Sequence, residues 1–429
     1  MIKFKLSLIA ELSKNKKMKR IKYIYKKRWM LFNIFFIDLI GYSLLTILRF
    51  FKKPQNIPES IKNILVFKLD HIGDVLMTTP ALNALKSRYP DASLTVVVGS
   101  WSKDILKNNL DVSEILIYNA YWFNRNTDKK FNIKKTLDFI KELRKRRFDI
   151  FYSFRGDFMG ILMGSLLRIP VRVGFNNGGG GFLLTHPMAP IENIHQVEQF
   201  LNAIKVNGLT HKYITRASDT DKRMKVAISE AERKFTATFI GKYSGKNENF
   251  IGFHIGAGYP SKLWTPEKYG ILIKRLHDDF GIHALLVGGD EDKVILKRIE
   301  SIIKNTGSIN SVGKTNIKET AALIEKCTLF IGNDSAPVHI ATAIGIPVIV
   351  IFSAANNPVG WKPFGSNVTC ITKDVLCKNC EKYECIDTKC MRMITVDEVY
   401  NKAKEILLKT KEKAYITTDG HRFSQIKTV

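Results

Sequence analysis

Residues 64–74 read ILVFKLDHIGD and set the architecture of the first half of the chain. Within Ile64–Leu69 every residue except Lys68 is apolar, as in a strand that is buried on both faces of a parallel sheet. A glycine turn follows this strand and brings Asp74 near a helix start, and a helical stretch runs over Ala81–Tyr89. A strand that leads directly into a helix is the repeating unit of a parallel α/β sheet.

The same alternation of short apolar runs and helical stretches continues along the chain in two series. In the first series we expect strands at Leu94–Val98, Ile115–Tyr118 and Asp149–Ser153, a helix at Lys134–Arg147 and a flexible loop at Asn176–Gly181. In the second we expect strands at Phe250–Ile255, His283–Val287, Leu329–Ile331 and Val348–Phe352, and helices at Pro266–Phe280, Asp292–Lys304, Ile317–Lys326 and Ala336–Ile344. The sequence therefore predicts two doubly wound α/β domains.

A charged, weakly apolar stretch around residues 219–249 separates the two series and marks the domain boundary. The length of 429 residues agrees with this division, because one hydrophobic core seldom organises so long a chain. We expect an N-terminal extension over residues 1–60, Rossmann-like domains over residues 61–218 and 250–410, a linker over residues 219–249 and a tail over residues 411–429.

Composition narrows the class of protein. With 45% hydrophobic residues, 25% charged residues and 13 prolines, the chain is an ordered globular protein rather than a disordered or fibrous one. Its formal net charge of +27 would suit a nucleic-acid-binding protein, but no recognition motif for nucleic acid is present. We therefore do not expect a nucleic-acid partner.

Part of this charge belongs to the N-terminal extension, whose first 53 residues hold 14 Lys and Arg against two acids. A basic stretch, Lys14–Arg28, precedes a mostly apolar stretch, Trp29–Leu48, in which Asp38 lies near the middle. An acid at that depth makes a bilayer span costly, so we expect a helix on the membrane surface, attracted to anionic lipid. A true span and a helix packed on the protein body are the alternatives. No signal-peptide cleavage site follows, so the body should stay on the cytosolic side.

In doubly wound sheets ligands bind beyond the carboxyl ends of the strands, and three strand ends here carry reactive residues. The first brings Asp74 to a helix start, where a carboxylate serves either as a general base or as a helix cap. The second is a small-residue turn from Gly256 that leads to Lys262, a charge suited to phosphate. It matches neither the Walker pattern nor the dinucleotide fingerprint.

The third strand end runs from Gly332 through Asp334 and Ser335 into a helix. Backbone amides at the start of that helix, together with its dipole, suit a diphosphate. Asp334 could accept hydrogen bonds from sugar hydroxyl groups, or it could cap the helix.

Taken together, these motifs resemble glycosyltransferase family 9, the heptosyltransferase family. The resemblance rests on Asp-x-Ile-Gly-Asp followed by Thr-Thr-Pro-Ala-Leu, on Lys-x-Trp after a glycine-rich turn, and on Asp-Ser-x-x-x-His-x-Ala with Gly-x-Pro downstream. These motifs occur in the family's order across residues 61–409. The resemblance implies a GT-B fold with two Rossmann-like domains facing a central cleft, an ADP-heptose donor on the C-terminal domain, an acceptor on the N-terminal domain, and inversion at the anomeric carbon.

The resemblance also assigns roles to residues. Asp74 matches the catalytic base, Lys262 the lysine at the donor diphosphate and Asp334 the aspartate at the donor sugar. Ser335, Ala336 and His339 match the diphosphate-side helix start, and Asp292 and Thr315 match positions near the donor nucleoside. These groups would stabilise the leaving charge without a metal ion. The Asp-x-Asp spacing of metal-dependent glycosyltransferases occurs at residues 290–292, but it also occurs by chance at residues 219–221.

Four of the six cysteines cluster, at Cys377, Cys380, Cys385 and Cys390. In a reducing cytosol such a cluster can hold a structural zinc ion or an iron–sulfur cluster, can take part in redox or disulfide chemistry, or can remain as unligated thiols. None of the four has a paired base that would make it a nucleophile. We therefore expect no cofactor in the reaction itself.

The expected function is that of an inverting glycosyltransferase. It would move heptose from ADP-heptose onto a lipid-linked acceptor, the lipopolysaccharide core or a related surface glycan, as a peripheral protein at the cytoplasmic face of the bacterial inner membrane. Transfer of a different sugar, a sugar-nucleotide epimerase and a degenerate membrane-bound scaffold are the alternatives. An epimerase would turn over the donor without an acceptor, and a scaffold would have lost Asp74, Lys262 or Asp334.

Overall fold

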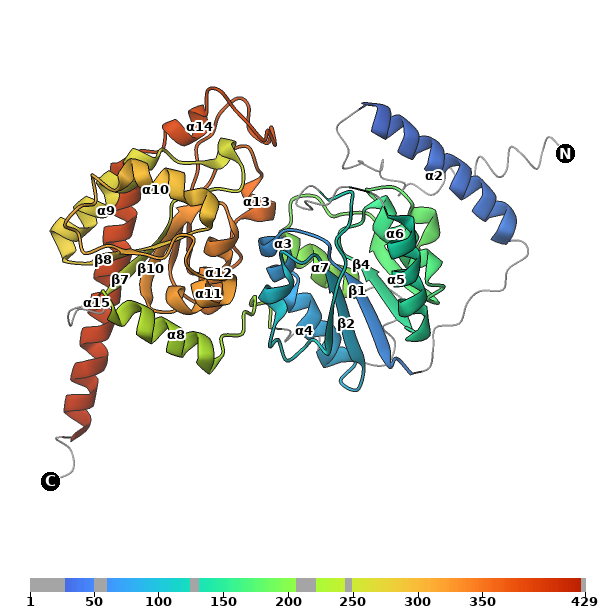
Figure 1. Cartoon of the computed structure of the whole chain (residues 1–429), viewed down its shortest axis with the longest axis horizontal. Coiled ribbons are helices and arrows are strands. Elements are labelled where there is room, and N and C mark those ends of the chain that lie inside the picture. The colour runs from blue at the N-terminus through green and yellow to red at the C-terminus, as the bar shows by residue number, and fades with distance from the viewer. Residues whose placement is uncertain are drawn as a thin grey trace.

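The computed structural model describes residues 28–49, 60–123, 130, 132–205, 221–243 and 249–425 (Figure 1). Two α/β domains lie side by side, each built on a six-stranded sheet in which all the strands are parallel. The two-domain α/β architecture expected from the sequence is confirmed.

The N-terminal sheet has the strand order β3-β2-β1-β4-β5-β6. Its strands are β1 (Asn63–Phe67), β2 (Ser93–Val98), β3 (Glu114–Ile117), β4 (Ile150–Ser153), β5 (Val171–Phe175) and β6 (His186–Met188). Its helices are α3 (Ile72–Leu76), α4 (Thr79–Arg88), α5 (Ile133–Lys145), α6 (Phe158–Leu166) and α7 (Gln196–Ile204), with short 3-10 helices η1 (Lys103–Leu106) and η2 (Gly181–Leu183). The helix α2 (Arg28–Arg49) lies along the outer side of this domain.

The C-terminal sheet repeats the pattern with the order β12-β11-β10-β7-β8-β9. Its strands are β7 (Phe250–His254), β8 (His283–Val287), β9 (Ile309–Asn310), β10 (Cys327–Asn333), β11 (Val348–Ile351) and β12 (Val368–Ile371). The accompanying helices are α8 (Glu230–Gly241), η4 (Pro260–Lys262), α9 (Pro266–Phe280), η5 (Asp290–Asp292), α10 (Lys293–Ile299), α11 (Ile317–Ile324), α12 (Ala336–Ile344), α13 (Pro358–Trp361), α14 (Lys389–Arg392) and α15 (Val396–Gln425).

The central strands are buried because helices cover both faces of each sheet, which is why they are rich in Ile, Leu, Val and Phe, as in β1 and β11. One buried apolar cluster continues from the first sheet to the second and includes Val75 of α3 and Val338 of α12. Between the domains, Nε2 of His195 lies 2.7 Å from the carbonyl oxygen of Lys362. Burial lowers the pKa of His195 to about 4, so its neutral ring donates this bond.

Several local expectations need correction. The loop at Asn176–Gly181, expected to be flexible, is largely buried, because Gly179 and Gly180 adopt positive φ and fold it against α2. The helix expected over Asp292–Lys304 is shorter, since α10 ends at Ile299. Helix α15 continues past residue 410, where we expected a tail.

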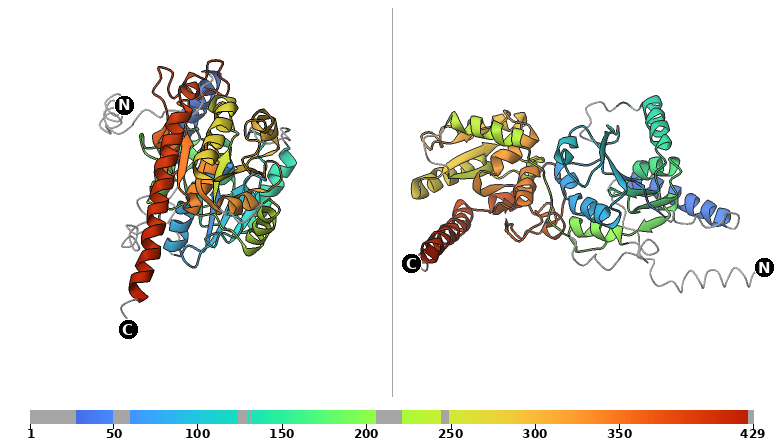
Figure 2. Two further views of the ribbon diagram at one scale, coloured as in Figure 1. Left: turned by 90° about the vertical axis from the view of Figure 1, so that its left-hand side faces the viewer. Right: turned by 90° about the horizontal axis from the view of Figure 1, so that it is seen from below.

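The apolar N-terminal stretch forms α2, which lies beside the N-terminal domain (Figure 2). Its mid-helix acid, Asp38, is buried and accepts the N–H of Gly180. Among the described residues, no helix combines the length and the apolar character needed to cross a bilayer. The basic stretch Lys14–Arg28 lies outside the described residues, except for Arg28.

Candidate active site

A cavity of about 720 Å³ lies between the domains, at the carboxyl ends of the central strands. Helix α3 supplies its N-terminal wall and contacts α12 of the opposite wall. All eight residues to which the sequence assigned catalytic or donor-binding roles line this one cavity, namely Asp74, Lys262, Asp292, Thr315, Asp334, Ser335, Ala336 and His339. The structure thus brings together residues from strand ends far apart in the sequence.

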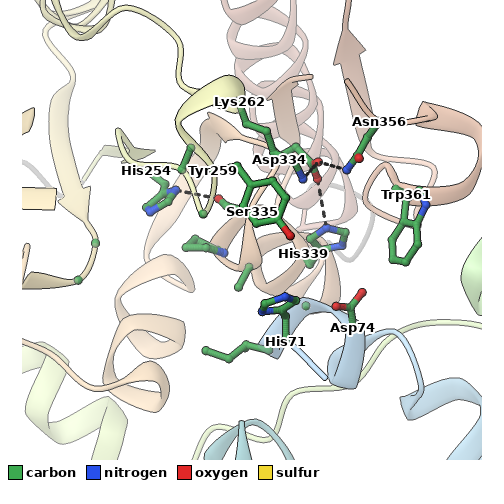
Figure 3. A pocket seen from close by; sticks show the side chains of 18 of the residues that line it. His71, Asp74, His254, Tyr259, Lys262, Asp334, Ser335, His339, Asn356 and Trp361 are labelled. Carbon is green, nitrogen blue, oxygen red and sulfur yellow. Dashed lines mark hydrogen bonds and ion pairs between the residues drawn. The ribbon is translucent and has the colours of Figure 1, made fainter. Parts of the chain in front are cut away.

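Asp74 lies in the first turn of α3, on the N-terminal side of the cavity (Figure 3). The N-cap of α3 is His71, and no side chain caps this helix, so the capping interpretation of Asp74 is wrong. Within the described part of the chain, the Asp74 carboxylate makes no hydrogen bond or ion pair. Burial, and then the negative charge of Asp70, raise its pKa to about 6.

Asp70 lies close by in a very different electrostatic setting. Its carboxylate is 2.9 Å from Nζ of Lys68 and 2.7 Å from Nη1 of Arg155. Burial works to raise the pKa of Asp70, but these two cations outweigh it and the pKa is lowered. Asp70 is therefore a paired anion, whereas Asp74 is a carboxylate without a hydrogen bond or ion pair among the described residues.

Asp334 and Lys262 form the centre of the C-terminal wall. Nζ of Lys262 lies 2.6 Å from Oδ2 of Asp334, and Nδ2 of Asn356 donates to the same oxygen at 3.1 Å. His339 lies 3.9 Å from the other carboxylate oxygen. Burial would raise the pKa of Asp334, but His339 and Lys262 outweigh it and hold the pKa below its usual value. Asp334 is therefore an anion that can accept hydrogen bonds, and Lys262 is a cation beside it.

The start of α12 lines the cavity through Ser335, Ala336 and Pro337, of which Pro337 has no backbone N–H. Its N-cap, Ser335, makes no side-chain cap, because the Ser335 hydroxyl instead lies 2.8 Å from Nδ1 of His254 and donates to the carbonyl of Asn333. The first-turn amides of α12, including that of Ala336, are left without a side-chain cap. Such uncapped amides, at the positive end of a helix dipole, form an anion site.

Asp292, which the resemblance places near the donor nucleoside, is buried and already makes polar contacts within the protein. Its Oδ2 accepts the N–H of Gly289 at 2.9 Å and lies 3.4 Å from Nε2 of His254. A side chain at Gly256 would collide with this carboxylate, since a Cβ there would lie 1.8 Å from Oδ1. Asp292, His254 and Ser335 therefore form a continuous chain of polar contacts along the cavity wall. Glu291, which the sequence did not single out, also lines the cavity, as does Thr315.

Sequence reasoning missed several other residues of the cavity. His254 is the last residue of β7, and Asn356 and Trp361 follow β11, so the rule that ligands bind beyond strand ends could have found them. His71, Trp101 and Tyr259 also line the cavity, but no motif distinguished them.

The four clustered cysteines are not gathered into one site. Cys377 is exposed, Cys380 and Cys385 are half-buried, and Cys390 is buried, with Sγ 3.6 Å from the Ser353 hydroxyl. Within the described ranges, no three His, Cys, Asp or Glu side chains are grouped so that they could hold a metal ion. The structural metal therefore stays a prediction. Asn379 and Glu381, which lie between these cysteines, line the cavity.

Comparison with known proteins agrees with this geometry. A family model described as glycosyltransferase family 9 (heptosyltransferase) matches residues 136–391. Lipopolysaccharide heptosyltransferase 3 of Escherichia coli K12 is 28% identical over 307 residues, which cover 69% of this chain and 83% of that protein. Lipooligosaccharide heptosyltransferase 2 of Campylobacter jejuni serotype O:2 is 25% identical over 348 residues, 78% of this chain and 95% of that protein.

Solved structures show the same fold. A family 9 glycosyl transferase from Veillonella parvula aligns with a TM-score of 0.70 at 21% identity, covering 82% of this chain and 99% of that one. ADP-heptose lps heptosyltransferase II of E. coli aligns with a TM-score of 0.66 at 23% identity, covering 81% and 99%. The residues matched by the family model include Lys262 and Asp334 but not Asp74, whose assignment depends on the cavity geometry.

Proposed function

Because the chain belongs to glycosyltransferase family 9, the heptosyltransferase family, we propose that it transfers heptose from ADP-heptose onto a lipopolysaccharide core or a related surface glycan. One observation carries this proposal. An unpaired carboxylate, Asp74, lines the same cavity as Lys262 and the start of α12, which suit an anion, and as Asp334, which suits sugar hydroxyl groups (Figure 3).

The C-terminal wall supports the donor assignment. Lys262 and the uncapped amides beginning at Ala336 offer positive charge to a diphosphate, and the Asp334 carboxylate offers an acceptor to sugar hydroxyl groups. His339 connects the two functions, because it lies in the first turns of α12 and beside Asp334. The nucleoside would extend toward Thr315 and the residues near Asp292.

The proposed reaction is a direct displacement with inversion at the anomeric carbon. Asp74 takes the proton from an acceptor hydroxyl, whose oxygen forms a bond to that carbon as the bond to the nucleoside diphosphate breaks. ADP leaves with the bonding electron pair, and Lys262 and the α12 amides stabilise its new charge. Preorganised donors of this kind contribute about 3 kcal/mol each, so the proposed reaction needs no metal ion.

The acceptor in this proposal is lipid-linked, so the enzyme works as a peripheral protein on the cytoplasmic face of the inner membrane. The heptosyltransferases to which the chain is similar are named for lipopolysaccharide and lipooligosaccharide acceptors, which supports this choice. The N-terminal wall around Asp74 would receive the acceptor hydroxyl group.

A calorimetric scan of the purified protein against ADP-, GDP-, UDP- and dTDP-sugars tests the donor. We expect selective binding of ADP-heptose, weakened at least about tenfold in Lys262→Ala, because one charge contact with the diphosphate is removed. Lys274→Ala is the matched control, since Lys274 lies in the same domain, on α9, and pairs with exposed Asp278 instead. The control should bind the donor like the wild type.

The other outcomes of the scan discriminate among the alternatives. Binding of a different nucleotide sugar would keep the cavity and the mechanism but discard heptose as the transferred sugar. Turnover of the donor without any acceptor would indicate an epimerase. Absence of all nucleotide-sugar binding would indicate a degenerate scaffold and would refute the proposal.

A further inference from the structure

Helix α2 has a buried inner face that is fastened to the N-terminal domain. Ile34, Asp38 and Gly41 are buried on this face, and Oδ1 of Asp38 accepts the N–H of Gly180 at 2.7 Å. The Asp38 side chain is only 5% exposed, and its hydrogen bond satisfies a buried amide. Asp38, the acid that makes a bilayer span costly, therefore holds α2 on the N-terminal domain.

The fit between α2 and the glycine loop is close. A Cβ added at Gly41 would lie 2.4 Å from the ring of Phe182, and one at Gly179 would lie 2.5 Å from Ile34. The rings of Tyr42 and Phe182 also meet edge to face, with centroids 5.9 Å apart. The inner face of α2 is thus a packed interface with one orientation.

The outer face of α2 is apolar and uncovered. Seven of its large side chains are between 37% and 62% exposed: Phe32, Phe35, Phe36, Ile37, Leu39, Ile40 and Leu44. The two other exposed residues between positions 32 and 44 are Asn33 and Ser43, so this stretch of the face carries no charge. A soluble monomer seldom exposes so many neighbouring aromatic and aliphatic side chains, so this surface has a partner.

We infer that the outer face of α2 inserts into the interface of an anionic bilayer while Asp38 holds the helix on the N-terminal domain. The charge pattern of the chain selects this partner. Lys14–Arg28 precedes the apolar stretch, and Arg49, Lys52 and Lys53 follow it, so positive charge flanks both ends. A second copy of the chain would bring the same positive charges together, which disfavours self-association through this face.

The position of α2 suits this role. In both views α2 lies on the outer side of the N-terminal domain, away from the C-terminal domain (Figures 1 and 2). The bilayer would thus hold the domain that carries Asp74, and the donor-binding wall would remain open to soluble nucleotide sugar. This inference rests on the proposed function for the lipid-linked acceptor, but the surface itself can be tested without sugar transfer.

The test is co-sedimentation of the full chain with vesicles of phosphatidylethanolamine and phosphatidylglycerol. Phe36→Ser combined with Ile40→Ser removes two outer-face side chains. The matched control is Ile133→Ser with Leu137→Ser, which removes two exposed apolar residues at the same spacing from α5. We expect the α2 variant to bind vesicles at least about tenfold more weakly than the wild type, and the control to bind as the wild type does.

Vesicle binding by the α2 variant equal to that of the wild type would overturn the inference. Concentration-dependent self-association of the wild type that the α2 variant abolishes would also overturn it, in favour of a second copy as the partner. Calorimetry with ADP-heptose separates this result from the proposed function. If the α2 variant binds both ADP-heptose and vesicles as the wild type does, only the membrane surface is refuted. If the wild type does not bind ADP-heptose, the proposed function is refuted.

Discussion

Asp74 and Asp70 lie four residues apart but face opposite electrostatic environments. Lys68 and Arg155 neutralise Asp70, whereas Asp74 is left with a raised pKa and no partner among the described residues. A general base works best when its pKa is close to the working pH, which a pKa of about 6 satisfies. This difference gives two predictions at the scale of single residues.

Replacing the proposed base should reduce turnover without affecting the donor site. We expect Asp74→Asn to lower kcat by about 10³-fold, within the range that general-base catalysis contributes. ADP-heptose affinity, measured by calorimetry, should stay nearly unchanged, because the donor groups lie on the C-terminal wall. Weakened donor binding together with normal single-turnover chemistry would contradict the assignment.

The pH profile should show the ionisation of Asp74. A carboxylate acts as a base only when it is deprotonated, so kcat/KM should fall about tenfold per pH unit below about 6 and level off above it. Asp70→Asn should move this midpoint to lower pH, because it removes a negative charge and leaves Lys68 and Arg155 uncompensated. Asp91→Asn, at an exposed acid of the same domain, should not move it.

The eight residues singled out in the sequence all line the cavity, because residues at the carboxyl ends of parallel strands lie at the same edge of a sheet regardless of their distance along the chain. The sequence could not predict the orientation of Asp292, whose carboxylate contacts Gly289 and His254. Those contacts depend on the packing of η5 beside Gly256. The resemblance assigned Asp292, and not Glu291, to the donor nucleoside, whereas both residues line the cavity.

At the scale of elements, the sequence identified most of the central strands and the helices between them. It missed the interior strand β5, the edge strands β6, β9 and β12, and the helices α6, α7 and α15. Strand β9 has two residues and β6 has three, one of them proline, so neither shows a readable alternation. For α2, the sequence predicted a helix on the membrane surface, with a bilayer span and packing on the protein body as the alternatives. The structure shows packing on the body because Asp38 finds an amide donor in the folded glycine loop.

That docking contact can be measured through stability. Asp38→Ala leaves the buried N–H of Gly180 without a partner, which should cost about 1–3 kcal/mol and lower Tm by a few degrees. Asp38→Asn keeps an oxygen acceptor and should cost less. Equal Tm values for the wild type and both variants would show that the contact does not fasten the helix.

The cysteine segment gives a prediction about metal removal. Ser261, next to Lys262, donates to the carbonyl of Lys382, and its N–H donates to the carbonyl of Tyr383 at 3.2 Å. A metal bound by the four clustered cysteines, Cys377 to Cys390, would therefore affect the donor-binding wall by holding the conformation of this segment. We expect dialysis against EDTA to leave the initial rate of transfer unchanged, with metal content followed by elemental analysis. A rate lost on dialysis with an unchanged Tm, and restored by added divalent metal, would contradict metal-independent catalysis, whereas a rate lost together with a lower Tm would indicate a structural metal in the cysteine segment.

At the scale of the whole molecule, function depends on how the two domains meet. His195, at the start of α7, reaches the carbonyl of Lys362, next to Trp361 of the cavity. Asp74 belongs to one domain and the donor groups to the other, so this contact helps to set the distance between base and donor. The sequence could not predict it, because neither residue lies in a motif.

His195→Ala should therefore loosen the pairing of the domains. We expect kcat to fall about tenfold through poorer orientation of the reacting groups, with donor affinity unchanged. His186→Ala is the control, because that imidazole contacts Thr185 within the N-terminal domain. A normal kcat in His195→Ala would show that this contact does not align the site.

The division of the cavity has a consequence for how such an enzyme can diversify. In the proposed reaction, Asp74 stands on the wall that receives the acceptor, whereas Lys262, Asp334 and the start of α12 stand on the wall that binds the donor. Each wall is encoded by a separate, continuous half of the gene. Mutation or recombination in one half can thus change the specificity for the donor sugar while the other half keeps the specificity for the acceptor. New surface glycans can therefore arise through a change in one specificity at a time.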